Sequence, residues 1–551
     1  MAGEPAWRQD EIRTAEVIAS LCLATDLGMG LPLEHGLHST LFAMRLADRL
    51  DVDSATASQT YYGCLLFYVG CTVDAEISAE LFKGDLLTNF NPVMFGSTAQ
   101  MMGGIMRALA DPESSAPVRA LQAAGRLPRA LRGHRRHIAA LCEVAQMLSE
   151  RLGMSPEVRR LFDHFTARWD GKGPTSAVHG EEIPLPLRIV HVARDAALQR
   201  MIGGVDYAAR VVRERGGGAF DPVIAARLAD EATEILALDD ERSAWDDVLA
   251  AEPAPRLTLR GEAIDRALAA MGDFADLAST YLVGHSAGVA EVAAAAAQRC
   301  GLPPGEVAAT RRAALVHDVG RVAVSVLIWQ KAGPLSPDEW EQVRLHAYHS
   351  ERVLCRSPLL AALLPVATYH HERLDGAGYH RGATAAALTT PARLLAAADA
   401  YHAMTEPRPH RPALTPELAA DLLGQEARAG RLDADSVAAV LDAAGHRAQH
   451  VVPPHVVPQH VAPEHVGPQH VARPAGLTER EAEVVGLLAR GLQTKQIARL
   501  LGISAKTADR HIQNAYAKIG ISTRAAAAVF AMQHGLVAWG ELPMARIGGR
   551  P

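Results

Sequence analysis

Two segments of the sequence, LVHDVGR at residues 315–321 and HHERLDGAGY at residues 370–379, concentrate histidines and carboxylates. His346 lies between them and Asp399 follows them. The surrounding residues are largely apolar and rich in alanine. Polar side chains are costly to bury in such surroundings unless each has a partner. A metal ion is such a partner, so these segments predict a buried metal site.

Any one of these histidines alone would most simply be an ordinary core residue. Their occurrence in adjacent pairs distinguishes the set from such residues. His317-Asp318 and His370-His371 are adjacent pairs on separate segments. Neighbouring side chains on a helix point about 100° apart, so each pair can serve two ions rather than chelate one. Two ions about 4 Å apart, bridged by an Asp, form a clamp for in-line attack on a phosphodiester. The residues alone therefore predict a two-metal hydrolase.

In this order, the same residues resemble the HD-GYP phosphodiesterase family over residues 257–445. The resemblance includes the Asp-Gly-x-Gly-Tyr motif at residues 375–379 and the Arg-Pro-His-Arg motif at residues 408–411. It implies an all-α helical bundle and a substrate of the cyclic di-GMP class. It also implies a cofactor of two divalent transition-metal ions, iron or manganese.

The resemblance further implies roles for individual residues. Asp318 would bridge the two ions and take part in catalysis with Arg321. Arg408 and Arg411 would bind the substrate phosphate, since a guanidinium group is a planar bidentate cation. The expected metal ligands are His285, His317, Asp318, His346, His370, His371 and Asp399.

Three positions depart from the family pattern. Tyr281 stands where members with a third metal carry Glu, so we expect two ions. Arg321 replaces a Lys and keeps the charge but cannot readily give up a proton, and His380 replaces the Pro that follows the Gly-Tyr pair. Two functions stay open: a metal-dependent cyclic-dinucleotide phosphodiesterase, and a non-catalytic transcription factor that senses a ligand or a metal. The complete ligand set favours the enzyme.

The first half of the chain repeats this pattern, with residues 35–71 matching residues 285–321 at a constant offset of 250 positions. We therefore predict a degenerate HD-GYP-like helical domain at residues 1–250, which docks on the active domain, senses a signal, or both. Residues 8–30 predict one amphipathic helix, and residues 252–255 predict a short stiff linker. The residues that replace metal ligands in this half are Phe67, Tyr68, Phe165, Thr166 and Arg194.

A proline-rich segment follows the second domain. From residue 450 to residue 471 a pentapeptide His-Val-x-Pro-x recurs. Proline at every fifth position forbids a helix and favours an extended, polyproline-like chain. We predict a His/Pro repeat linker at residues 446–475 rather than a metal site.

The remaining residues, 476–540, predict a DNA-binding domain, because residues 477–535 resemble a LuxR-type helix-turn-helix. Thr478 and Glu481 form a capping box, Gly502 marks the turn, and Ser504 caps the third helix. Residues 477–534 hold eight Lys or Arg against four Asp or Glu. By resemblance the third helix enters the major groove of duplex DNA. The candidate DNA contacts are Lys495, Lys506, Thr507, Arg510, His511, Asn514 and Lys518.

Composition limits the remaining possibilities. The 551 residues exceed one hydrophobic core, and the net charge of −7 confines any nucleic-acid affinity to a local surface. Six scattered cysteines without a Cys-x-x-Cys pair indicate a reducing cytoplasm. The longest apolar run, residues 61–73, is too short to span a bilayer, so no membrane association is expected. Small helix-turn-helix domains commonly bind paired half-sites, so we expect a homodimer.

Overall fold

The computed structural model describes residues 11–70, 93–111, 114–173, 178–239, 242–446 and 474–537. The fold is almost entirely helical, as predicted, and the described residues contain only two short strands. The predicted linker at residues 446–475 lies, apart from its ends, outside the described residues. Within the described part of the chain, no helix combines the length and the apolar character needed to cross a membrane.

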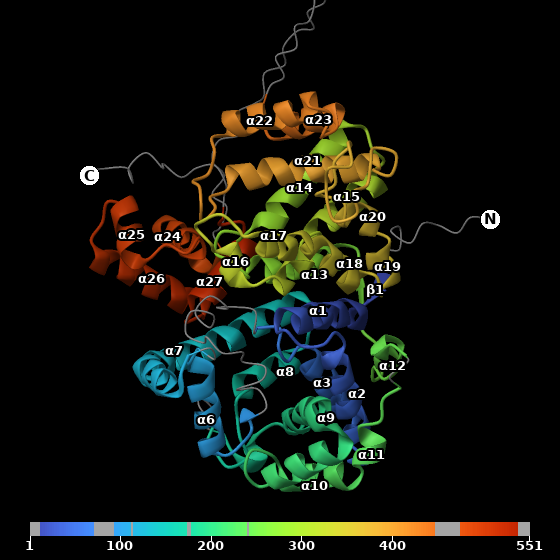
Figure 1. Cartoon of the computed structure of the whole chain (residues 1–551), viewed down its shortest axis with the longest axis vertical. Helices are drawn as coiled ribbons and strands as arrows, with labels where there is room; N and C mark the ends of the chain where they lie inside the picture. The colour runs from blue at the N-terminus through green and yellow to red at the C-terminus, as the bar shows by residue number, and fades with distance from the viewer. Residues whose placement is uncertain are drawn as a thin grey trace, which may run out of the picture.

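The first half forms a helical bundle in which α2 and α3 pack against α9 (Figure 1). Its elements are β1 (Glu11–Arg13), α1 (Thr14–Gly28), α2 (His35–Arg49), α3 (Ser54–Leu65), α6 (Thr98–Leu109), α7 (Ala116–Arg151), α8 (Pro156–Arg160), η3 (Leu161–His164), η4 (Gly180–Glu182), α9 (Leu185–Arg215), α10 (Pro222–Asp230), α11 (Ala232–Ile235) and α12 (Ala244–Ala250).

The second half forms another bundle, in which α14 packs against α15, α21 and α23. Its elements are β2 (Thr258–Arg260), α13 (Glu262–Asp276), α14 (His285–Arg299), α15 (Pro304–Val316), η5 (Val319–Ala323), α16 (Val326–Trp329), α17 (Pro337–Arg344), α18 (His346–Leu354), α19 (Pro358–Ala361), α20 (Leu364–Ala367), α21 (Thr390–Thr405), α22 (Pro416–Arg428) and α23 (Ala434–Ala443).

The two halves are joined through the start of the chain. β1 pairs antiparallel with β2, with Glu11 opposite Arg260, and α1 packs on η5 and α18 of the second half (Figure 1). The prediction of one amphipathic helix at residues 8–30 is therefore wrong. Residues 11–13 form a strand, and α1 is buried on nearly all sides because both halves cover it.

The predicted linker at residues 252–255 is also part of this junction rather than a free spacer. Glu252 is buried, pairs with Arg13, and accepts a hydrogen bond of 2.6 Å from the Tyr62 hydroxyl. Its carboxylate also accepts the Leu257 backbone N–H at 3.2 Å. The start of the second half is thereby bonded to β1 and α3.

The C-terminal domain contains η6 (Pro474–Gly476), α24 (Glu479–Ala489), α25 (Thr494–Leu500), α26 (Ala505–Ile519) and α27 (Arg524–Gln533). The predicted capping box of Thr478 and Glu481 and the cap by Ser504 are present. This domain lies against both halves (Figure 1). Glu143 of α7 accepts hydrogen bonds of 2.8 and 2.6 Å from the backbone N–H and hydroxyl of Ser522, and Val283 belongs to the apolar cluster around α24 and α27.

Candidate metal centre

Helix ends from several directions meet in the interior of the second half. His285 is the first residue of α14 and His346 the first residue of α18. Residues 317–318 join α15 to η5, residues 370–371 follow α20, and Asp399 lies within α21. The structure thus brings together all seven predicted ligands: His285, His317, Asp318, His346, His370, His371 and Asp399.

Asp318 lies at the centre of this group, and its two oxygens face different histidines. Oδ2 lies 3.1 Å from His317 Nε2 and 3.5 Å from His285 Nε2. Oδ1 lies 3.2 Å from His346 Nε2 and 3.4 Å from His370 Nε2. The carboxylate therefore joins two groups of histidines, which is the arrangement expected of a bridge between two ions.

Asp399 divides its oxygens in a similar way. Its Oδ1 lies 3.2 Å from His285 Nε2, and its Oδ2 lies 3.7 Å from His371 Nδ1. Potential ligand atoms of His285, His317 and Asp399 lie within 4.8 Å of one another, and so do those of His346, His370 and His371. These two sets are adjacent halves of one cage.

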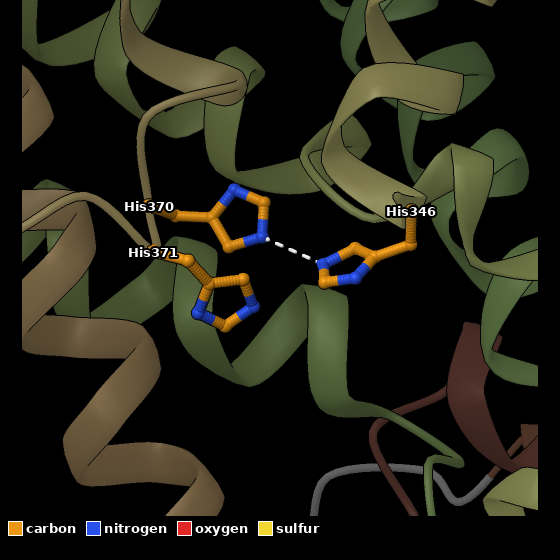
Figure 2. A group of neighbouring side chains, drawn as sticks. All are labelled: His346, His370 and His371. Atoms are coloured by element: carbon orange, nitrogen blue, oxygen red, sulfur yellow. Dashed lines mark hydrogen bonds between the residues drawn. The ribbon is translucent and has the colours of Figure 1, made fainter. Parts of the chain in front are cut away.

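The orientation of the rings fits metal ions. Nδ1 of His317, His346 and His370 lies 2.5–2.7 Å from a backbone carbonyl three residues earlier. If each Nδ1–H donates to that carbonyl, each Nε2 carries a lone pair. His346 Nε2 and His370 Nε2 nevertheless lie 3.1 Å apart (Figure 2). A cation between them would remove the repulsion of two lone pairs, so the donor set fits a metal.

The charge states of three cage residues suit a metal, whereas two others must lose a proton to bind one. Burial alone would lower the pKa of His317 and His285, but the neighbouring carboxylates raise the pKa of His317 to about 9 and that of His285 well above its usual value. Burial alone would raise the pKa of Asp318, but Arg321 and His317 hold that pKa well below its usual range. Burial lowers the pKa of His370 to about 4 and takes the pKa of His371 well below its usual value. Metal ligands must be ionised carboxylates and neutral imidazoles. Asp318, His370 and His371 therefore already hold the states that an ion requires.

Arg321 lies directly beside the cage. Its Nη2 pairs with Asp318 Oδ2, and its guanidinium carbon lies 5.2 Å from the centre of the Trp329 ring. Nε and Nη1 of this buried side chain have no hydrogen-bond partner among the described residues. Arg321 thus keeps two N–H-bearing nitrogens for an anion near Asp318.

The two other predicted arginines differ in what they contact. Arg408 donates to Tyr281 O at 2.9 Å and to Glu406 Oε2 at 2.7 Å, which places its guanidinium near His285. Arg411 instead donates to several backbone carbonyls, including those of Ala403 and Glu406, at 2.6 and 3.0 Å. The main observed role of Arg411 is to satisfy carbonyls at the end of α21. Its phosphate-binding role stays a prediction.

Sequence reasoning missed Glu406 and gave no role to Tyr379, the last residue of the Asp-Gly-x-Gly-Tyr motif. Glu406 is fully buried, and its Oε2 lies 2.9 Å from His285 Nδ1. Tyr379 stacks on His371 with ring centres 4.6 Å apart. The position of Glu406 between Asp399 and Arg408 offered a signal, because a carboxylate that lies between two predicted site residues, directly after an apolar helix, needs a partner if it is buried.

The corresponding positions of the first half form an aromatic cluster. The guanidinium carbon of Arg194 lies 3.8 Å from the ring centre of Tyr68 and 4.5 Å from that of Phe67. Phe165 packs on Phe67 with ring centres 4.1 Å apart. The groups of candidate metal ligands among the described residues all lie in the second half.

The predicted DNA-contacting residues fall into two classes. Lys506, Arg510 and Asn514 are exposed and recur every four residues, so they form one stripe along α26. Lys495 is exposed at the start of α25. These four residues are open to a partner in the docked domain.

The remaining candidates are more constrained. The Thr507 hydroxyl lies 2.8 Å from the Ser504 hydroxyl at the helix cap, and His511 is partly buried. Lys518 Nζ donates to Glu481 Oε2 at 2.7 Å and to Gly476 O at 3.1 Å. The observed contacts of Lys518 are therefore within its own domain, and its predicted phosphate contact is not tested.

Two protein families match this chain. Residues 270–436 match the HD domain, and residues 475–531 match the luxR family of bacterial regulatory proteins. A solved structure, a cyclic GMP-AMP specific phosphodiesterase of Vibrio cholerae, aligns with a TM-score of 0.55 at 23% sequence identity. The alignment covers 80% of this chain and 99% of the solved chain. At this sequence identity, the similarity supports the fold alone.

Curated relatives are similar over different lengths. The 3'3'-cGAMP-specific phosphodiesterase 3 of Vibrio cholerae is 27% identical over 413 residues, which are 74% of this chain and 89% of the relative. The 3'3'-cGAMP-specific phosphodiesterase 1 of Vibrio cholerae is 33% identical over 30% of this chain and 38% of its own length. A cyclic di-GMP phosphodiesterase of Pseudomonas aeruginosa is 36% identical over 24% and 32%.

These matches confirm both resemblances, while the degenerate repeat in the first half stays a prediction. The chain therefore contains an HD domain at residues 270–436 and a domain of the luxR family of bacterial regulatory proteins at residues 475–531, and its curated relatives are cyclic-dinucleotide phosphodiesterases.

Proposed function

We propose that the second half hydrolyses a cyclic dinucleotide with two divalent transition-metal ions, and that the luxR-family domain connects this activity to transcription by binding DNA. The observation that carries the proposal is the position of Asp318, whose two oxygens face two different pairs of histidines. A site for a single ion would not require the two oxygens of one carboxylate to face separate pairs of histidines. The names of the relatives, which are cyclic-dinucleotide phosphodiesterases, support the reaction class.

The division of the ligands assigns each ion a set of residues. His285 and His317 would hold one ion, and His346, His370 and His371 the other, with Asp318 and Asp399 shared. Two bound ions, iron or manganese, polarise a phosphodiester and lower the pKa of water. The outcome would be cleavage of one phosphodiester bond by water.

Arg321 and Arg408 act on the substrate in this proposal. Nε and Nη1 of Arg321 have no hydrogen-bond partner among the described residues and would donate to a substrate phosphate near Asp318, and a guanidinium keeps its charge throughout. Arg321 therefore stabilises the negative charge on the phosphate in the transition state rather than donating a proton. Arg408 binds a phosphate oxygen at the edge of the cage next to His285.

We propose cyclic di-GMP as the substrate, with 3'3'-cGAMP as the first competitor to compare, because the names of the relatives include both. The test is elemental analysis of the full chain together with incubation with each dinucleotide, followed by chromatography of the products. Two metal ions per chain and a linear product support the proposal. Bound metal without a product from either dinucleotide, with iron or manganese supplied, contradicts hydrolysis.

A second candidate is a non-catalytic transcription factor whose cage senses a ligand or a metal. The pairing of Arg321 with Asp318 favours it, because this cation already neutralises the bridging carboxylate. The same incubation separates the two functions. A sensor would bind the dinucleotide or the metal and change its affinity for DNA without forming a product.

DNA binding is proposed for α26. The exposed stripe of Lys506, Arg510 and Asn514 suits the major groove, while Lys495 suits a phosphate. We expect two chains on paired half-sites, so a homodimer remains a prediction. We propose that the protein works in the cytoplasm, because a regulator of transcription must reach DNA.

For the first half we propose a degenerate HD-GYP-like domain. Asp26 accepts the Gly36 N–H at 3.1 Å, and Asp276 accepts the Ser286 N–H at 2.9 Å, again 250 positions later. Both contacts lie at the start of the helix that carries the first histidine of each half, α2 or α14. In this proposal, the cation of Arg194 and three aromatic rings would stand where the second half has its metal cage.

A further inference from the structure

One cage histidine is held differently from its neighbours. His317, His346 and His370 each follow a helix, and their Nδ1 atoms face a carbonyl in its last turn. Such carbonyls have no partner within their own helix. His285 begins a helix, as His346 also does, but no helix ends just before it, and the carbonyl three residues earlier, Leu282 O, accepts the backbone N–H of His285 at 2.9 Å. His285 therefore needs another acceptor for Nδ1–H.

Glu406 supplies that acceptor. Its Oε2 lies 2.9 Å from His285 Nδ1, and both side chains are completely buried. The opposite ring atom, His285 Nε2, faces Asp318 and Asp399 at 3.5 and 3.2 Å and has no hydrogen-bond partner in the part of the chain that the structure describes. A hydrogen bond from Nδ1–H to Glu406 fixes the tautomer in which Nε2 offers its lone pair to the cage.

The same carboxylate holds two further groups. Arg408 Nη2 donates to Glu406 Oε2 at 2.7 Å, and His402 Nδ1 lies 3.0 Å from Oε1. Gly288, on α14, leaves room for the His402 ring, because a Cβ at this position would overlap its Nε2. The carboxylate is thus enclosed from several sides.

We propose that Glu406 is the positioning residue of this centre. It orients His285 toward one of the two metal subsites and anchors Arg408 for the substrate phosphate. The inference rests on the proposed metal centre and deepens it. One carboxylate thereby connects metal binding at one subsite with substrate binding, whereas the subsite of His346, His370 and His371 does not depend on it.

Substitutions at Glu406 should therefore affect the two subsites unequally. Glu406→Ala leaves His285 free to turn or to change its tautomer, so affinity should fall about tenfold to a hundredfold at one subsite. The second subsite should keep its affinity. Glu406→Gln retains an amide oxygen that accepts the Nδ1–H bond and should recover part of the loss.

The experiment is a titration of the metal-free full chain with Mn²⁺ in competition with a chromophoric chelator. It compares the wild type, Glu406→Ala and Glu406→Gln. The matched control is Glu252→Gln, since Glu252 is also a buried carboxylate paired with an arginine but lies at the junction of the two halves. Glu252→Gln should bind two ions with the affinities of the wild type. If Glu406→Ala does not fold, Glu406→Gln alone should show a weakened subsite.

A second readout tests the link to Arg408. With bis(p-nitrophenyl) phosphate and saturating Mn²⁺, Glu406→Ala should raise KM more than it lowers kcat, because a phosphate-binding cation has lost its anchor. Equal affinities at both subsites in wild type and Glu406 variants, or a wild type that takes up no Mn²⁺, would overturn the inference. A further outcome separates the two proposals. If the wild type binds two ions, the Glu406 variants weaken this binding, and the wild type shows no turnover, hydrolysis is contradicted but the role of Glu406 in metal binding is supported.

Discussion

Arg321 pairs with Asp318, the residue whose carboxylate joins the two groups of histidines in the cage. Both side chains are buried, at 5% and 1% exposure. The bridging carboxylate of Asp318 therefore has a cationic partner within the protein itself, the guanidinium of Arg321, independently of any metal ion. This relationship affects what a substitution at either residue should do.

Asp318→Ala should abolish hydrolysis and lower metal content at both subsites, because the shared ligand is lost. It should also destabilise the fold, since the buried Arg321 loses its partner at a cost of about 3–5 kcal/mol. Elemental analysis, turnover and urea unfolding followed by circular dichroism measure the three effects. The double variant Asp318→Ala with Arg321→Met should recover stability but not metal, and equal turnover in the wild type and Asp318→Ala would contradict the enzyme.

Removal of the metal should lower the melting temperature of the full chain and abolish turnover, because the ligands lose the ions that stabilise the folded state. Addition of Mn²⁺ should restore both. The control is Arg194→Met, which changes the aromatic cluster of the first half and should leave two ions per chain. A metal content that is lower in Arg194→Met than in the wild type would refute the assignment of both ions to the second half.

The first half should be sensitive to acid. Burial lowers the pKa of His191 to about 4 and that of His35 to about 3, below the value of about 6.5 in an unfolded chain. Their contribution to stability is therefore complete above pH ~6.5 and is lost as the pH falls from there toward the folded-state values.

His191→Gln should reduce this loss, because one titrating group is removed while the amide can still donate to Phe165 O. Between pH 6.5 and 4.5, the slope of unfolding free energy against pH should decrease by up to about 1.4 kcal/mol per pH unit. Urea unfolding of metal-free protein measures it, with the exposed His179→Gln as the control. An unchanged slope for His191→Gln would refute the argument.

DNA binding should depend on α26 in the full chain. Arg510→Ala should weaken specific binding by about 1–3 kcal/mol, because an exposed guanidinium on the stripe can read a guanine edge. Lys495→Ala should weaken all sequences to a similar degree and reduce the salt dependence. Fluorescence anisotropy at several salt concentrations compares both variants with Lys518→Ala, which should change affinity less because Lys518 binds Glu481. Affinity that does not respond to salt would exclude the proposed interface.

The sequence predicted the cage because its residues stand in adjacent pairs with recognisable order, and all seven ligands meet in the structure. The caps of the C-terminal domain were also predictable, since Thr478 and Ser504 act within one turn of helix. Glu406 was missed because its function depends on a contact with His285 across 121 positions. The burial of α1 was missed for a similar reason, because no local pattern shows that a second half covers its polar side.

The pairing of β1 with β2 has a consequence for how the chain is made. Glu11 and Arg260 are 249 positions apart. At about 5–20 residues per second, the ribosome needs on the order of 10–50 s to synthesise this interval. During that time α1 has left the exit tunnel, but the surface of η5 and α18 that covers it does not yet exist. The nascent first half must therefore keep an apolar helix from aggregating until the second half emerges.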